Sequence, residues 1–312
     1  MRYPFDAPAP GQTLQIAPEL TWCRMPLPIA LDHVNVYLLG PQDDTIMVDT
    51  GFNSQQGQQL TGEWLQGRKG RVLATHHHPD HIGLSAHLDA EGWPLMTHRV
   101  EWLHALAIEG SSNEHSGRRM AEFFKTYGAD QATFDRHLAA GNTAIRAIHL
   151  PLTYTAINPN DTLQVGDLKF EYLIGEGHSP AMIMLHEPDQ GWLFAADQIL
   201  SGISPVVALF AYDNGHNPLK DFLDSISRLK SIDKDVLVFP GHGAPFYGLH
   251  ERIDQLTDHH HERLEQCVEL HQEGLTPFAM MQRLFGHRDL NAYGEMFAIG
   301  EVLAHLRYAS LV

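Results

Sequence analysis

Residues 74–83, with the sequence ATHHHPDHIG, concentrate side chains that bind metal ions. Four of them lie within six residues: His76, His78, Asp80 and His81. In an extended chain, residues two apart point to the same side, so His76 and His78 can reach one ion. Pro79 then bends the chain and aims Asp80 and His81 at a second position nearby. The pattern H-x-H-x-D-H predicts a metal site on a loop between a strand and a helix, with His77 directed away from it.

Three more candidate ligands follow, each at the end of an expected strand and beside a glycine, alanine or proline. They are His178 in GEGHSP, Asp197 in FAAD and His242 in FPGHG. A chain with 22 histidines will place some of them together by accident. Chance accounts poorly for a complete motif that is followed by three ligands in such contexts, so we expect the seven side chains to meet at one site.

The order and contexts of these residues resemble the metallo-β-lactamase-fold hydrolases, above all their glyoxalase II and lactonase branches. The likeness covers about residues 12–247. It implies a binuclear site with two Zn²⁺ ions, or with iron or manganese in their place. The implied ligands are His76, His78 and His178 for the first ion, Asp80, His81 and His242 for the second, and Asp197 as a bridge. Asp49, which ends the apolar run at 46–48, would orient a metal ligand by a hydrogen bond without binding the ion itself.

Such a site implies a hydrolase in which a metal-bridging hydroxide attacks a small thioester, ester or lactone. Asp80 would orient this nucleophile or return a proton. Tyr154 and Tyr212 are expected in loops from which a phenol could donate a hydrogen bond to a substrate carbonyl. Cysteine is absent from all seven ligand positions, which argues against antibiotic hydrolysis.

Three alternatives stay open at this point. The first is a metal-dependent endoribonuclease or phosphodiesterase, because a metal-bound hydroxide also attacks phosphorus. The second is a persulfide dioxygenase with a single iron. The third is a binding protein whose metal site holds a signal molecule without turnover.

Composition limits the range of partners. The formal charge of −17 disfavours nucleic acid, whose phosphates are normally bound by Lys and Arg. No apolar run approaches the roughly 18 residues that span a bilayer, and the N-terminus lacks the apolar core of a signal peptide. We therefore expect a cytoplasmic protein with a small-molecule substrate and no membrane contact. The two cysteines, Cys23 and Cys267, are expected as free buried thiols.

Strand-like and helical segments alternate up to about residue 247. The expected strands are 20–25, 33–39, 45–49, 71–74, 93–97, 162–165, 168–174, 181–186, 192–196 and 236–239, and the expected helices are 54–66, 84–90 and 218–230. Together with the resemblance, this pattern predicts an α/β fold, a four-layer αββα sandwich of two mixed sheets with the metal site along one edge. The residues before position 20, rich in proline and glycine, predict an irregular arm.

Two helical regions accompany the sandwich. Residues about 100–140 form an expected insertion that could fold over the metal site as a lid. Apolar spacings of three and four predict helices at 253–271, 276–285 and 290–308. We therefore divide the chain into a metallo-β-lactamase-like domain, 1–247, and a small all-α appendage, 248–312, which resembles the winged-helix-like tail of some family members. The appendage would pack on the sandwich or mediate contacts in a homodimer.

Overall fold

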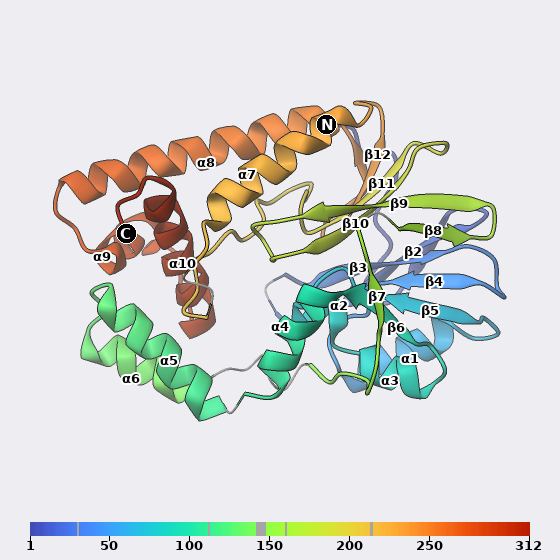
Figure 1. Cartoon of the computed structure of the whole chain (residues 1–312), viewed down its shortest axis with the longest axis horizontal. Helices are drawn as coiled ribbons and strands as arrows, with labels where there is room; N and C mark the ends of the chain where they lie inside the picture. Colours follow the sequence, from blue (N-terminus) through green and yellow to red (C-terminus); the bar gives the residue numbers. More distant parts are fainter. Residues whose placement is uncertain (30, 112, 142–147, 160, 213–214) are drawn as a thin grey trace.

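The computed structural model describes residues 1–29, 31–111, 113–141, 148–159, 161–212 and 215–312. Two β-sheets face each other, with helices on their outer sides, and a group of helices extends from one end of this sandwich (Figure 1). The expected α/β sandwich of two mixed sheets with C-terminal helices is confirmed.

The first sheet has seven strands in the order of the sequence. They are β1 (Thr13–Ala17), β2 (Leu20–Pro26), β3 (His33–Leu39), β4 (Thr45–Val48), β5 (Gly70–Leu73), β6 (Leu95–His98) and β7 (Thr155–Ile157). Strands β1 to β4 pair antiparallel, and β4 to β7 pair parallel. The helices of this half are α1 (Gln55–Trp64), α2 (Pro79–Ile82) and α3 (Ser85–Ala90).

The second sheet has six strands, of which all neighbours but β11 and β12 pair antiparallel. In spatial order they are β13 (Phe246–Tyr247), β12 (Leu237–Pro240), β11 (Trp192–Ala196), β10 (Met182–Glu187), β9 (Leu168–Gly175) and β8 (Thr162–Val165). Helix α7 (Pro218–Arg228), continued by the short 3-10 helix η2 (Leu229–Ser231), packs on it through Leu219, Phe222 and Ile226.

The core between the sheets follows from the two-residue period of the strands. Along β9, Leu168, Phe170 and Tyr172 are buried and the residues between them are exposed. The rings of Phe194 and Phe239 stack at 4.5 Å in this core. This rigid layer fixes the strand ends from which the functional loops depart.

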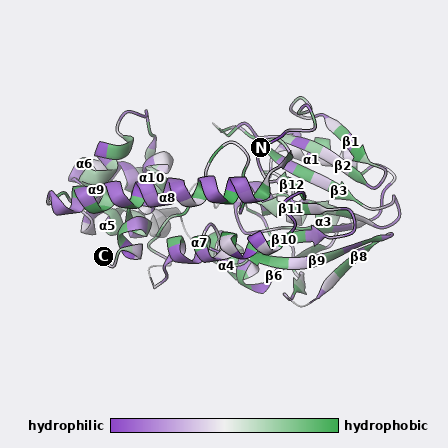
Figure 2. Ribbon diagram, turned by 90° about the horizontal axis from the view of Figure 1, so that it is seen from above, coloured by the Kyte–Doolittle hydropathy of each residue, from purple (hydrophilic) through white to green (hydrophobic). Residues whose placement is uncertain are grey.

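The helical regions meet each other beside the sandwich. The insertion forms α4 (Arg99–Glu109), α5 (Asn113–Thr126) and α6 (Gln131–Ala140), and the tail forms α8 (Leu249–Gln272), α9 (Pro277–Phe285) and α10 (Ala292–Tyr308). Figure 2 shows α8 running from the sandwich to the remaining tail helices. The start of α8 is buried in one cluster with α7 and β12, while α5 and α6 contact α9 and α10. Residues 248–312 are all described and contain helices only, so the likeness to a winged helix does not extend to a β-wing.

Three short strands were not expected. The predicted irregular arm is wrong at 13–17, because β1 pairs with β2 there although none of its residues is fully buried. Strands β7 and β13 have three and two residues, too few to show a period in the sequence. No helix among the described residues has both the length and the apolarity to cross a membrane.

Candidate metal centre

The histidine-rich loop starts where β5 ends and is fixed by Asp49, the residue after β4. Asp49 has a left-handed backbone with φ of 63°, and its Oδ1 accepts a hydrogen bond from the Thr75 amide at 2.8 Å. Farther along, the amides of Thr50 and Gly51 donate to the carbonyls of His81 and Asp80, both at 3.0 Å. The loop is thus tied at both ends to the end of the neighbouring strand β4.

The other three predicted ligands lie at strand ends of the second sheet. His178 follows β9, Asp197 follows β11, and His242 follows β12. Gly241 allows this approach, because a side chain there would place its Cβ 2.1 Å from Asp197 Oδ1. The Thr75 carbonyl accepts a hydrogen bond from the Ile183 amide at 2.9 Å, which joins the two sheets beside the site.

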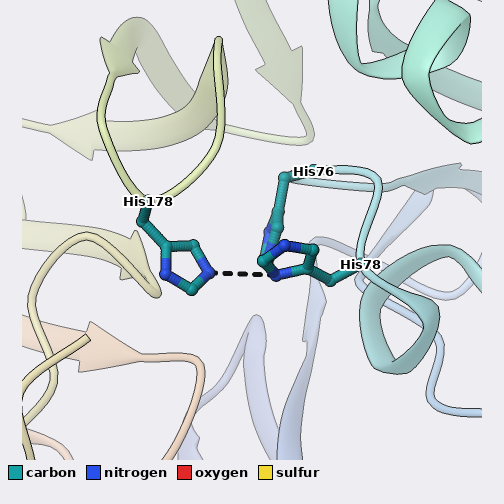
Figure 3. Close-up of side chains that lie close together, drawn as sticks. All are labelled: His76, His78 and His178. Carbon is teal, nitrogen blue, oxygen red and sulfur yellow. Dashed lines mark hydrogen bonds between the residues drawn. The ribbon is translucent and has the colours of Figure 1, made fainter. Parts of the chain in front are cut away.

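The structure brings all seven predicted ligands together at this edge. Three overlapping groups have their ligand atoms within 4.8 Å of one another: His76, His78 and His178; His76, His81 and Asp197; and Asp80, His81 and His242. In the first group, Nδ1 of His78 lies 3.0 Å from Nε2 of His76 and 3.0 Å from Nε2 of His178 (Figure 3).

Asp197 lies between the two outer groups. Its Oδ2 is 3.5 Å from His81 Nε2, 3.6 Å from His178 Nε2 and 3.3 Å from His242 Nε2. Asp80 lies on the far side, with Oδ2 3.6 Å from His81 Nε2 and 3.4 Å from His242 Nε2. One carboxylate therefore contacts ligands of both groups, and the other contacts ligands of the second group.

Hydrogen bonds to the outer ring nitrogens fix which nitrogen faces the site. Nδ1 of His81 donates to Asp49 at 2.8 Å, Nδ1 of His178 donates to the Val206 carbonyl at 2.8 Å, and Nδ1 of His242 donates to the His33 carbonyl at 2.6 Å. The Thr75 hydroxyl donates to Asp49, so it accepts from Nδ1 of His76 at 2.9 Å. In these four rings Nε2 is left facing the site, as a metal ligand requires, whereas His78 turns its Nδ1 inward.

Two buried polar atoms at the centre lack a hydrogen-bond partner among the described residues, Nε2 of His81 and Oδ1 of Asp197. A buried unsatisfied group of this kind costs about 1–3 kcal/mol. Five imidazoles and two carboxylates form a donor set that suits zinc, iron or manganese, so the residues present fit a metal centre.

The electrostatics divide the site into two halves. Burial and the neighbouring imidazoles lower the pKa of His76 and His78 well below its ordinary value, which keeps both rings in the neutral form that binds metal. Burial also lowers the pKa of His242, but the carboxylates of Asp197 and Asp80 outweigh burial and raise this pKa to about 10. Burial also lowers the pKa of His81, but the same carboxylates, with Asp49, outweigh it and raise that pKa well above its ordinary value.

The pKa of Asp197 lies well below its ordinary range. Burial alone would raise this pKa, but the charges of His242 and His81 have the larger effect and lower it. The second half of the site is therefore built around ionised carboxylates, which attract positive charge.

Glu101, which the sequence analysis missed, holds two ligand loops together. Its side chain is fully buried; Oε2 accepts from the amide and Nδ1 of His77, at 3.0 and 2.6 Å, and Oε1 accepts from the Ser179 hydroxyl and the Ala181 amide, at 2.9 and 2.6 Å. His77 points to Glu101, as expected for a ring directed away from the ligands. The sequence signal was a lone acidic residue in an otherwise apolar helical turn, between Val100 and Trp102.

A small pocket opens beside the first group. Its described lining residues are His77, His78, His104, Gly177, His178, Ser179, Pro180, Ala208, Phe210, Tyr212, His216 and Pro218. Tyr212 is thus at the site mouth. Tyr154 is not among these residues; its ring stacks on Trp102 at 4.4 Å with an interplanar angle of 17°. Helix α4 of the insertion reaches the pocket through His104, whereas α5 and α6 pack on the tail.

Comparison with known proteins gives four similarities. A sequence model of the metallo-beta-lactamase superfamily matches residues 29–242. The crystal structure of a beta-lactamase domain protein from Burkholderia ambifaria is 31% identical, with a TM-score of 0.85 over 99% of this chain and 92% of that one. A probable metallo-hydrolase of Bacillus subtilis (strain 168), YqjP, is 27% identical over 278 residues, 84% of this chain and 83% of the relative. A hydroxyacylglutathione hydrolase of Legionella pneumophila (strain Paris) is 30% identical, but over 86 residues, 28% of this chain and 31% of the relative.

Proposed function

Because this chain belongs to the metallo-beta-lactamase superfamily and is a metal-dependent hydrolase, we propose that it holds two Zn²⁺ ions and hydrolyses a small thioester, ester or lactone. The seven predicted ligands would divide as the resemblance implies. His76, His78 and His178 would hold one ion, Asp80, His81 and His242 the other, and Asp197 would bridge them.

The position of Asp197 carries this proposal. Its Oδ2 lies within 3.6 Å of ring nitrogens from both groups, as a bridging ligand must. A single-iron site needs one group of ligands and leaves the second group of Asp80, His81 and His242 unexplained. The geometry therefore favours a two-ion hydrolase over the persulfide dioxygenase.

Two bound cations would lower the pKa of water toward neutrality and polarise the substrate carbonyl. The chain's own groups supply the remaining functions. Asp80, whose side chain is 15% exposed, is the carboxylate at the second group and would orient the attacking water and return a proton to the leaving group. Asp49 would keep His81 in the tautomer with Nε2 free, and Glu101 would hold the loops of His76 and His178 at their present separation.

The pocket supports an uncharged substrate. None of the described residues that line it is lysine or arginine, the side chains that bind phosphate. The net charge of −17 also repels a nucleic acid. Both observations favour the acyl hydrolase over a ribonuclease or phosphodiesterase.

The first prediction concerns metal and Asp80. We expect the zinc-loaded protein to hydrolyse simple acyl thioesters or lactones, chelation to abolish turnover, and Asp80→Asn to lower kcat by about 100-fold or more, the contribution of a general acid-base group. Asp167→Asn, in the exposed turn between β8 and β9, is the matched control and should leave kcat unchanged. Metal content measured on the zinc-loaded wild type and on Asp167→Asn should be two ions per chain.

Several outcomes contradict the proposal. Full activity after exhaustive metal removal rules out a metal-dependent reaction. Cleavage of single-stranded RNA with Mn²⁺ or Zn²⁺, in the absence of thioester or lactone turnover, favours the nuclease. One iron per chain with oxygen uptake on persulfide favours the dioxygenase. An intact two-ion site that turns over none of these substrates favours a binding protein.

A further inference from the structure

The segment 206–212, between β11 and α7, connects the metal centre to its mouth. The Val206 carbonyl accepts the hydrogen bond that orients His178, at 2.8 Å. A few residues later, Phe210 and Tyr212 line the pocket, and their rings stack at 5.3 Å with an interplanar angle of 20°. This segment therefore sets both the orientation of one ligand and the character of the pocket wall.

Helix α10 of the tail packs directly behind this segment. The Leu209 amide donates to the Gly300 carbonyl at 3.0 Å. A Cβ at Gly300 would lie 2.8 Å from the Ala208 Cβ, so the lack of a side chain lets helix and segment touch. Phe297, one turn earlier, has its ring 6.1 Å from that of Phe210. Phe297 of the tail thus packs against Phe210, one of the residues that line the pocket.

The first turn of α10 extends the aromatic surface. The ring of Tyr293 meets Phe297 edge to face at 4.6 Å. Tyr293 is 44% exposed, and Tyr212, which lines the pocket, is 54% exposed, so both rings present apolar surface to solvent.

The insertion holds the same turn from the opposite side. Glu295 pairs with Arg136 of α6 at 2.8 Å and with His137 at 3.2 Å. Figure 1 shows α10 between the α5 and α6 pair and the segment that leads into α7. The tail helix is therefore held in place by elements on both sides, as the wall of a preformed binding site should be.

We propose that α10 and the segment 206–212 together bind an apolar, aromatic-sized acyl group of the substrate, through Phe210, Tyr212, Tyr293 and Phe297. This inference rests on the proposed acyl hydrolase activity and names the substrate class for it. Phe, Tyr and His rings line the surface and no Lys or Arg does among the described residues of the pocket, so the acyl group and its leaving group are both uncharged. A thiol ester of an anionic carrier such as glutathione would find no lysine or arginine side chain among these described residues to bind the carrier.

The test, our second prediction, compares three thioesters on the zinc-loaded full chain. Two share the uncharged thiol N-acetylcysteamine and carry an acetyl or a 3-phenylpropanoyl group, and the third carries 3-phenylpropanoyl on glutathione. We expect the phenylpropanoyl thioester of the uncharged thiol to have the highest kcat/KM. Phe297→Ala and Tyr293→Ala should raise its KM by about 10-fold, the usual effect of removing part of an apolar pocket, and change the KM of the acetyl thioester less than about twofold.

Tyr308→Ala is the matched control, because it removes an exposed aromatic ring from the far end of the same helix. Equilibrium binding gives a readout besides turnover: the ketone in which a methylene replaces the sulfur of the phenylpropanoyl thioester should bind about 10-fold more weakly to Phe297→Ala, by calorimetry. Tyr293→Ala tests the same wall at an exposed position if Phe297→Ala does not fold.

The outcomes separate this inference from the proposed function. If the wild type hydrolyses no thioester, ester or lactone, the proposed function fails, and ketone binding alone decides whether the wall exists. If the wild type hydrolyses thioesters but the variants leave KM and ketone affinity unchanged, or glutathione increases kcat/KM, the apolar wall on α10 is wrong and the activity stands.

Discussion

At the scale of single residues, the metal centre depends on side chains that never reach the substrate. Glu101 accepts hydrogen bonds from residues 77 and 181, on the two ligand loops that belong to different sheets. Burial alone would raise the pKa of its carboxyl. The charge of His77 and the hydrogen bonds that Glu101 accepts have the larger effect, so the net shift of the pKa is downward. The ionised form is therefore part of the folded structure at neutral pH.

The third prediction follows from that ionised form. Glu101→Gln replaces one acceptor oxygen by an NH₂ group that faces donors, so we expect the free energy of unfolding at pH 7 to fall by about 3 kcal/mol. A depressed pKa stabilises the fold above the unfolded value near 4.5, and this contribution is lost as pH falls through the folded value. Urea unfolding at pH 7 and at pH 3.5 should therefore show a smaller difference between variant and wild type at the lower pH.

Glu265→Gln, on the exposed face of α8, serves as the control for this comparison. If Glu101→Gln unfolds at the wild-type urea concentration at pH 7, the four hydrogen bonds contribute nothing to stability. The connection between the two ligand loops must then come from elsewhere.

At the scale of elements, the strands that carry the ligands could be predicted because they leave local signals. A strand-like run that ends beside a glycine, alanine or proline and a candidate ligand marks β9, β11 and β12, and the motif of 76–81 follows β5. The elements missed are short, such as β13, or gain their stability from a neighbour, as β1 does from β2. The orientation of the imidazole rings could not be predicted from the sequence. His242 donates to the His33 carbonyl and His178 to the Val206 carbonyl, and every residue has a backbone carbonyl, so the sequence does not mark these acceptors.

The helical tail contains a buried histidine pair that does not belong to the metal centre. Between α8 and α10, Nδ1 of His260 lies 3.3 Å from Nε2 of His305, which in turn donates from Nδ1 to the Glu301 carbonyl. Both rings are at most 1% exposed. Burial lowers the pKa of His260 to about 2 and that of His305 to about 4. Both imidazoles are therefore neutral in the folded protein.

The fourth prediction is a pH dependence of folding from this pair. In the unfolded chain these histidines titrate near 6.5, so the unfolded state binds more protons below that pH and stability falls as pH falls. His260→Leu removes one such group and should reduce the slope of unfolding free energy against pH by about 1.4 kcal/mol per unit between pH 6 and pH 4.5. Urea unfolding across this range measures it, with His261→Leu on the exposed face of α8 as control. Equal slopes in wild type and His260→Leu would mean that His260 is protonated in the fold.

At the scale of the whole molecule, the centre lies where the two sheets and the tail meet. The candidate ligands His76, His78, Asp80 and His81 follow the first sheet and His178, Asp197 and His242 follow the second, so a cation bound by either outer group would link the two halves of the sandwich. The core is continuous from β12 through the start of α8 to α10. Because of this continuity we expect the chain to unfold as one unit, including the tail.

The fifth prediction is that metal removal destabilises the entire chain. A ligand that binds the folded state alone stabilises it by about 2.7 kcal/mol at a hundredfold excess over its dissociation constant, and ligands from both sheets exist together in the folded state alone. Chelation should therefore lower the midpoint of thermal unfolding by several degrees in a single transition, and readded Zn²⁺ should restore it. In His242→Ala the second group loses a ligand, so chelation should shift the midpoint less. A midpoint that does not respond to chelator in the wild type would mean that no cation connects the sheets, whereas two separate transitions would mean that the tail folds independently of the sandwich.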